Sequence, residues 1–120
     1  MEHNIKTFAD ACEALKISHE LPFITGVTTH QYKSMIAFYK LQIIADALNE
    51  GWKPDGNNYN QGKYYPWFLY EKDSSVFSFF GSSVTPTFTA RSTSLVYKTS
   101  DLAWYAGAQF IAEYNDFLKR

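Results

Sequence analysis

The residue types best suited to holding a ligand lie close together, between positions 52 and 67. This segment combines the flat faces of Trp and Tyr with the amides of Asn. Aromatic faces stack on planar groups, and amides both donate and accept hydrogen bonds, so this mixture could hold an extended peptide, a sugar or unpaired bases. The candidate binding residues are Trp52, Lys53, Asn57, Asn58, Tyr59, Asn60, Tyr65 and Trp67.

The same segment also has a purely structural interpretation. Its rings could fill the join between a helix and a sheet, and its Asn side chains could bond the loop backbone. Both interpretations stay open on the sequence alone, and they differ in how much of Trp52 and Trp67 reaches solvent.

Other kinds of chemistry find little support in the spacing of residues. The three histidines lie in separate segments and Cys12 is the only cysteine, so no metal-ligand pattern is present. Neither a G-x-S-x-G elbow nor a glycine-rich phosphate loop occurs. Glu113 and Asp116 are one helical turn apart, which is typical of a solvated helix face. We therefore predict no catalytic, metal or cofactor residues, although an acid–base pair can assemble only in the fold.

Composition narrows the class of protein further. A chain of 120 residues suits a single domain, 1–120, and 46% hydrophobic residues are enough for a core. The net charge of −1 gives no general attraction to nucleic acid. One cysteine excludes an internal disulfide, and no stretch is apolar for long enough to cross a membrane. Without the apolar core of a signal peptide, we expect a cytoplasmic protein and no membrane partner.

Two helices are expected in the first half of the chain. The first is predicted over residues 7–16, with a capping box of Thr7 and Asp10 at its start. Cys12 lies on the apolar stripe of this helix, so we expect it to be buried. A longer helix begins after Thr28 and ends near Gly51, and its wide apolar surface predicts packing on more than one side. In the linker 18–27, we expect apolar residues to be anchored to the core, namely Leu21, Phe23 and Ile24.

Strand patterns fill the third quarter of the chain. They cover residues 63–70, 76–80, 84–91 and 94–98, and short polar links such as G-S-S at 81–83 predict turns between them. Pro66 lacks a backbone donor, so its strand should lie at an edge or carry a bulge.

A final helix is expected from a Ser100 cap to the end of the chain. Gly107 in its middle predicts a close approach by another backbone. The fold class is therefore α+β in the order α-α-β-β-β-β-α. Three helices would pack on one face of a three- to four-stranded antiparallel β-meander.

Three phrases also resemble a known group of proteins. They are N-E-G-W-K-P-D at 49–55, K-Y-Y-P-W-F at 63–68 and K-T-S-D-L-A-W-Y-A-G-A-Q-F at 98–110. The chain resembles, over about residues 32–117, a family of small uncharacterised proteins encoded by phages, prophages and mobile elements of gut bacteria. This resemblance implies an accessory protein inside a bacterial cell, and it implies no activity.

We therefore expect a non-enzymatic interaction module with an unidentified protein partner, which binds through the aromatic and Asn-rich segment. A structural protein that assembles into homo-oligomers is the alternative. Binding to single-stranded nucleic acid ranks third, and it would need cations gathered near the sheet, namely Lys53, Lys63, Lys72, Arg91 and Lys98.

Overall fold

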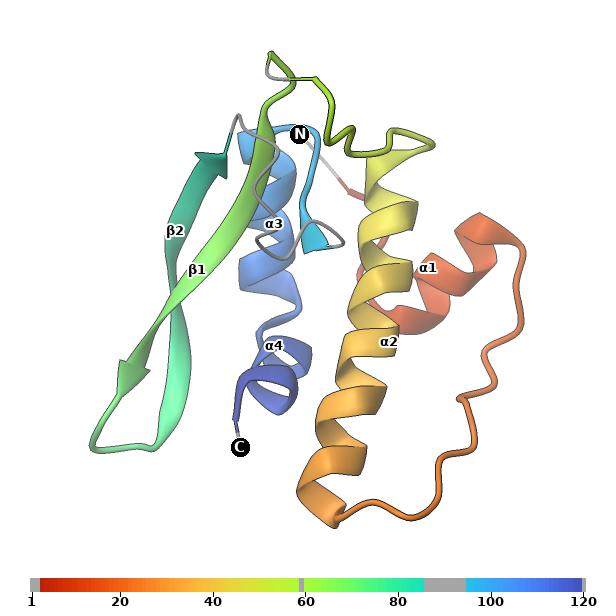
Figure 1. The fold of residues 1–120 in the computed structure, drawn as a ribbon, viewed down its shortest axis with the longest axis vertical. Helices are drawn as coiled ribbons and strands as arrows, with labels where there is room; N and C mark the ends of the chain where they lie inside the picture. Colours follow the sequence, from red (N-terminus) through yellow and green to blue (C-terminus); the bar gives the residue numbers. More distant parts are fainter. Residues whose placement is uncertain (1–2, 59, 86–94, 120) are drawn as a thin grey trace.

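The protein combines helices with a β-ribbon (Figure 1). This computed structural model describes residues 3–58, 60–85 and 95–119. Their elements are, in order, α1 (Phe8–Leu15), α2 (Thr29–Asn49), β1 (Lys63–Glu71), β2 (Val76–Thr85), α3 (Ser100–Gln109) and α4 (Ile111–Leu118). The α+β class is confirmed. The predicted element counts are wrong, because the described residues form four helices and a two-stranded antiparallel sheet.

The first two helices begin where their capping boxes place them. Both boxes are complete, formed by Thr7 with Asp10 and by Thr28 with Gln31. α2 ends one residue earlier than the Gly51 signal suggests, because Glu50 already adopts the left-handed conformation at φ 48°. Gly51 continues it at φ 89°. Local hydrogen bonding therefore decides these ends.

The predicted C-terminal helix is in fact two helices. Thr99, and not Ser100, caps α3 by accepting a hydrogen bond from the amide of Leu102. The chain then leaves helical geometry at Phe110, with φ −107° and ψ 33°. This break lets α3 follow the ribbon while α4 turns to pack against α2 (Figure 1). One straight helix could not make both contacts.

The predicted turn at 81–83 is also wrong, because β2 runs through it without interruption. Gly81 pairs with Trp67, and a register shift follows, so that Phe79 pairs with Phe68 and Phe80 becomes the extra residue of a bulge. Pairing with β1 thus overrides the local preference of Gly and Ser for turns. The only turn of this hairpin lies at 72–75 among the described residues.

The predicted strand 94–98 contributes one bridge, between Tyr97 and Tyr64. The amide of Tyr64 donates to the Tyr97 carbonyl at 3.0 Å, and the amide of Tyr97 donates back at 2.7 Å. On either side of Tyr97, the backbone groups of Val96 and Lys98 bond the side chain of Asn49 in α2 and not a strand. Its amide nitrogen donates to the Val96 carbonyl and its oxygen accepts from the Lys98 amide, both at 2.9 Å. Predicted strand residues 86–91 and Ser94 lie outside the described residues.

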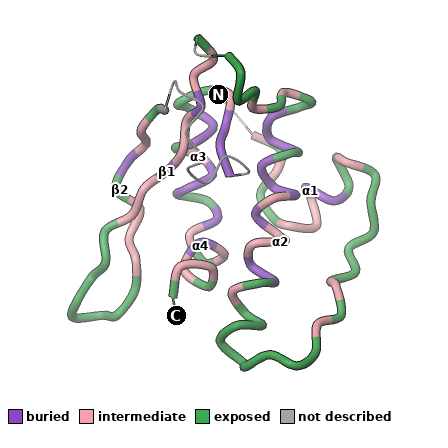
Figure 2. Tube along the Cα trace, in the orientation of Figure 1, coloured by how far each residue is buried: buried purple, intermediate pink, exposed green. Residues whose placement is uncertain are grey.

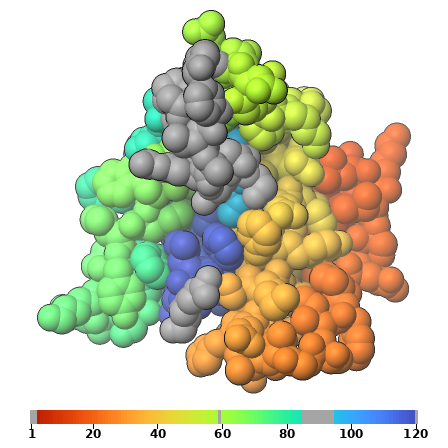
Figure 3. Space-filling model, in the orientation of Figure 1, coloured from red at the N-terminus to blue at the C-terminus, as the bar shows by residue number. Residues whose placement is uncertain are grey.

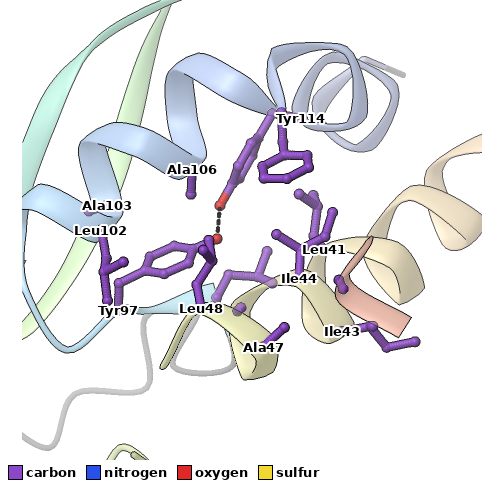
Figure 4. Close-up of a cluster of buried hydrophobic side chains, with 14 of the residues drawn as sticks. Leu41, Ile43, Ile44, Ala47, Leu48, Tyr97, Leu102, Ala103, Ala106 and Tyr114 are labelled. Atoms are coloured by element: carbon purple, nitrogen blue, oxygen red, sulfur yellow. Dashed lines mark hydrogen bonds between the residues drawn. The ribbon is translucent and has the colours of Figure 1, made fainter. Parts of the chain in front are cut away.

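The elements form successive layers, from the ribbon through α3 and α4 to α2 and then α1 (Figures 1 and 2). α2 contacts both α1 and α4, which confirms that its wide apolar surface serves more than one side. The core lies between these helices and around Tyr97, as the side chains in Figure 4 show. Cys12 is buried there as expected, and burial, together with the charge of Glu13, raises the pKa of its thiol.

The linker between α1 and α2 does not behave as predicted. Phe23 is 93% exposed, Leu21 is also exposed, and only Ile24 is half-buried. The linker 17–27 runs along the outside of the molecule, away from the core (Figure 2). The apolar side chains of Leu21 and Phe23 therefore remain largely in contact with solvent.

Candidate functional site: the β-ribbon and the groove beside it

Residues 52–62, which join α2 to β1 and are called the elbow below, are held by their own side chains. The Gln61 amide accepts from the backbone of Asp55 at 2.6 Å and donates to the Lys53 carbonyl at 2.9 Å. The Asp55 carboxylate accepts from the amide of Asn57 at 2.9 Å. Such bonds give the described residues of the elbow the hydrogen-bond partners that a helix or strand would otherwise supply.

The predicted binding amides of the elbow agree in part with a binding role and in part with a structural role. Asn58 uses its side-chain oxygen to accept from the amide of Asn60 at 3.0 Å, which supports the structural one. The side chains of Asn57 and Asn60 are exposed and form no hydrogen bond with the described residues. Tyr59 lies outside the described residues.

The remaining two candidates in the elbow, Trp52 and Lys53, form few contacts with the rest of the chain. Trp52 is half-buried, and its backbone amide donates to the Asn49 carbonyl at 3.0 Å as the chain leaves α2. Lys53 forms an ion pair with Asp46 at 3.5 Å, but both side chains are mostly exposed. Solvated pairs of this kind contribute little stability. Lys53 is therefore accessible to a partner, whereas Trp52 offers only part of its ring.

Lys63, the first residue of β1, is fully buried. Its ammonium lies 3.4 Å from the Gln61 carbonyl and 3.5 Å from the Asn58 carbonyl. A buried ammonium needs such acceptors, because losing its hydration is costly. Lys63 thus ties the elbow to the sheet. It was expected among the surface cations that could meet nucleic acid, and its burial removes it from that group.

One face of the ribbon is seated on α3, at Gly107. A Cβ on this glycine would lie 2.5 Å from the ring of Phe79 and 2.8 Å from Cβ of Pro66. The predicted close approach is therefore present, but strand side chains make it and not another backbone. Neighbouring strand residues point to opposite faces, so Tyr65 and Trp67 face away from α3.

The opposite face of the ribbon carries apolar side chains that α3 does not cover. We call this set the outer strip: Tyr65, Trp67, Leu69, Val76 and Phe80. The rings of Trp67 and Phe80 pack with their centres 4.4 Å apart, yet Phe80 remains 54% exposed. The indole nitrogen of Trp67 lies 3.6 Å from where a Cβ of Gly81 would be, so this glycine provides room for the indole.

Two of the predicted binding residues, Tyr65 and Trp67, belong to the outer strip. Sequence reasoning missed the other three, Leu69, Val76 and Phe80. Leu69 could have been found from the alternation that starts at Tyr65, since residues two apart share a strand face. Phe80 could not, because its direction depends on the bulge.

The two edges of the ribbon differ in what covers them. On β2, the Asn115 amide of α4 binds the backbone of Phe77 twice, at 2.7 and 2.8 Å, as another strand would. On β1, Tyr97 pairs with Tyr64, and strand alternation brings the backbone groups of Phe68 and Tyr70 to the same edge. Within the described part of the chain, no residue bonds these two from that side.

Pro66 lies between Tyr64 and Phe68, on the same edge of β1. Its missing N–H would point away from β2, so the proline removes no bond from the β1–β2 ladder. The prediction that Pro66 belongs to an edge strand is confirmed.

An apolar groove of about 260 Å³ runs beside β1. It is lined by residues of both strands, of α4 and of the segment before α3: Tyr65, Pro66, Trp67, Phe68, Phe77, Leu95, Tyr114, Phe117 and Leu118. None of these residues carries a charge at neutral pH. In Figure 3, the side chains of β1 stand beside those of α4 at this place. Such a lining favours an apolar ligand.

Tyr114 reaches from the groove into the core. Its hydroxyl lies 3.0 Å from that of Tyr97, as Figure 4 shows. Burial raises the pKa of both phenols, so both stay neutral and serve as hydrogen-bonding groups. This pair fixes the floor of the groove to the bridge between Tyr97 and β1.

Two larger hollows lie elsewhere, of about 510 Å³ at the start of α2 and about 540 Å³ at its end. None of the predicted binding residues lines either one. Among residues 3–58, 60–85 and 95–119, no three His, Cys, Asp or Glu side chains lie close enough to hold a metal ion. None of the helices in these ranges is long and apolar enough to cross a membrane.

Comparison with protein-family models, with curated proteins and with solved structures gives no match for this chain. The candidate site therefore stands on its geometry. That geometry consists of a partly exposed apolar strip, an uncovered strand edge within the described residues, and a groove without charge.

Proposed function

We propose that this protein is a non-enzymatic interaction module that binds an extended apolar segment of a protein along the edge of β1. One observation carries the proposal: an apolar groove lies beside an edge strand. The backbone groups of Phe68 and Tyr70 face that edge, and no described residue bonds them. An added strand would satisfy these groups and place its side chains in the groove.

The chemistry of the groove favours a peptide over the other ligands considered. Main-chain hydrogen bonds to an edge give affinity for any extended segment, and an apolar groove then selects the side chains. A sugar needs many polar partners, which the groove lining does not supply. Nucleic acid needs cations to meet its phosphates, and the burial of Lys63 removes one of the expected cations.

In this proposal, only part of the aromatic and Asn-rich segment borders the groove. Tyr65 and Trp67 border the groove, whereas Lys53, Asn57 and Asn60 of the elbow are exposed near the start of β1. The resemblance to proteins of phages and mobile elements supports an accessory protein in a bacterial cytoplasm as the setting. We therefore expect its ligand to be a protein present in the host cell.

A pair of designed peptides tests the proposal. The probe is a blocked peptide that alternates Phe and Thr between terminal lysines, and the control carries Ser in place of each Phe. We expect the probe to change the intrinsic Trp fluorescence with a dissociation constant at least ten-fold lower than that of the control. Equal binding of the two peptides would refute an apolar groove site.

A matched pair of variants locates the binding. Leu118→Glu places a charge in the groove, and Val84→Glu places the same charge at an exposed position of β2 outside the groove lining. Leu118→Glu should weaken probe binding at least ten-fold, while Val84→Glu leaves it unchanged. Circular dichroism checks that both variants fold. Equal effects of the two variants would show that the peptide binds elsewhere.

A further inference from the structure

The linker 17–27 presents apolar side chains that its own chain leaves uncovered. Phe23 is 93% exposed, and several neighbours are more than a third exposed, namely Ile17, Leu21 and Val27. A nearly fully exposed Phe forgoes the burial that most stabilises large side chains. Together, Phe23 and these three partly exposed residues leave more apolar surface uncovered in the linker than folding of the single chain requires.

The backbone of this linker is also free to pair. Residues 18–25 are neither helix nor strand, and the one hydrogen bond formed within them, among described residues, joins the Glu20 amide to the Ser18 hydroxyl. Pro22 favours an extended conformation for Leu21 before it. Pairing of this segment with a strand edge would therefore break no helix or sheet hydrogen bond among the described residues.

The linker cannot reach the groove of its own chain. In Figure 1, the ribbon and the linker lie at opposite sides of the molecule, with α2 and α1 between them. Any contact between the linker and the groove must therefore join two copies of the chain.

We propose that the linker of one copy lies in the β1 groove of a second copy, and that the exchange is reciprocal. This inference rests on the proposed function, because it names the segment that the groove accepts. Each copy carries both a linker and a groove, so two identical contacts related by a two-fold axis would close a dimer. Residues 21–24 would pair with the edge of β1 beyond Pro66.

Size and charge agree with this arrangement. Residues 21–24 in a strand span about 13 Å, and residues 66–70 of β1 span about 17 Å, at roughly 3.3 Å per residue. Leu21, Phe23 and Ile24 carry no charge, and neither does the groove lining. No ionic group therefore has to lose its water when the linker enters the groove.

The state of the full chain in solution is the first test. Sedimentation and light scattering across concentration should show wild type passing from the 13.8 kDa single copy to twice that mass. Phe23→Ser and Leu118→Glu should each lower the association constant at least ten-fold. Val84→Ser, which alters a side chain exposed outside both contacts, should leave it unchanged.

Mixing the two defective variants gives a stricter test. Phe23→Ser keeps its groove and Leu118→Glu keeps its linker, so an equimolar mixture can still form one of the two contacts. We expect the mixture to associate more tightly than either variant alone. An unchanged mass on mixing would contradict a linker-to-groove exchange.

A peptide of residues 17–27 separates this inference from the proposed function. It should bind the Phe23→Ser chain, and a version with Ser in place of Phe should not. If wild type stays a single copy at every concentration, or if Phe23→Ser associates like wild type, the inference is wrong. Binding of the alternating Phe and Thr peptide in that case would leave the proposed function standing with a foreign partner. Failure of both peptides would end both proposals.

Discussion

In the helical half of the molecule, large rings such as Phe110 and Tyr114 are almost fully buried, whereas Phe80 of the ribbon is more than half exposed. The difference follows from layering. The helices have neighbours on several sides, while the ribbon gives one face to α3 and the described residues leave its other face open (Figure 2). The aromatic excess of this chain therefore divides into core residues and residues that folding alone does not require.

Polar groups show the same contrast. In the core, Asn49 satisfies the backbone of Val96 and Lys98, and the hydroxyls of Tyr97 and Tyr114 satisfy each other. No buried side-chain polar atom lacks a hydrogen-bond partner among the described residues. Saturated groups of this kind are not available to a ligand, whereas the backbone of Phe68 and Tyr70 at the ribbon edge has no partner among the described residues.

The largest expected effect is the difference in stability between two Phe→Ala variants, one in the core and one on the ribbon. Phe110→Ala should lower the free energy of unfolding by about 3–5 kcal/mol, because it empties a buried site at the break between α3 and α4. Phe80→Ala should cost less than about 1 kcal/mol, since more than half of its ring already meets water. Urea unfolding of both variants measures the difference, and similar losses would mean that the ribbon face is covered.

Asn49→Ala should have the next largest effect. It leaves the Val96 carbonyl and the Lys98 amide without their partner, at about 1–3 kcal/mol for each group that stays dry. Asn57→Ala is the control, because that side chain is exposed and its loss should change stability by less than about 0.5 kcal/mol. A neutral Asn49→Ala in thermal unfolding would show that water replaces both bonds.

The next comparison is between Gly107, where the ribbon packs on α3, and Gly56, which has no neighbouring atoms in the way of a methyl group. The new methyl of Gly107→Ala would meet the ring of Phe79 and Pro66, and overpacking costs about 1–3 kcal/mol. That loss should outweigh the gain in helix propensity of about 1 kcal/mol. Gly56→Ala meets nothing within 4 Å and should be nearly neutral. Equal melting temperatures for the two variants would mean that the ribbon shifts freely on α3.

The buried hydroxyl pair should show non-additive mutations. Tyr97→Phe or Tyr114→Phe leaves one hydroxyl unpaired and should cost about 1 kcal/mol. The double variant removes both polar atoms and should cost no more than either single change. A double-mutant cycle by denaturant unfolding measures this coupling, and simple addition of the two losses would contradict it.

Alkaline pH gives the smallest effect. Folding raises the pKa of Tyr97 and Tyr114, so their contribution to stability is complete below the unfolded value near 10 and is lost as pH rises through the folded values. At pH 10 half of the unfolded phenols are ionised, and the loss is about 0.4 kcal/mol for each tyrosine. The double Phe variant should lose less stability between pH 9 and 10, and an identical pH profile would exclude these phenols as the cause.

Much of the candidate site depends on contacts that sequence patterns do not encode. The alternation after Lys63 places Tyr65 and Trp67 on one strand face, so these two could be selected from sequence. The groove joins β1 to Leu95 and α4, which are more than twenty residues away. The exposure of Phe23 was likewise unpredictable, because an apolar residue in a linker is buried only if the fold brings a surface to it.

The sequence by itself determined the features that arise within a few residues: both capping boxes, the length of α2, and the tolerance of Pro66 in an edge strand. Tertiary structure alone decided the passage of β2 through Gly81, the helix break at Phe110 and the burial of Lys63. The reason is the range of the forces involved. Caps and prolines act through neighbouring backbone groups, whereas burial and strand pairing depend on segments that only the folded chain brings together.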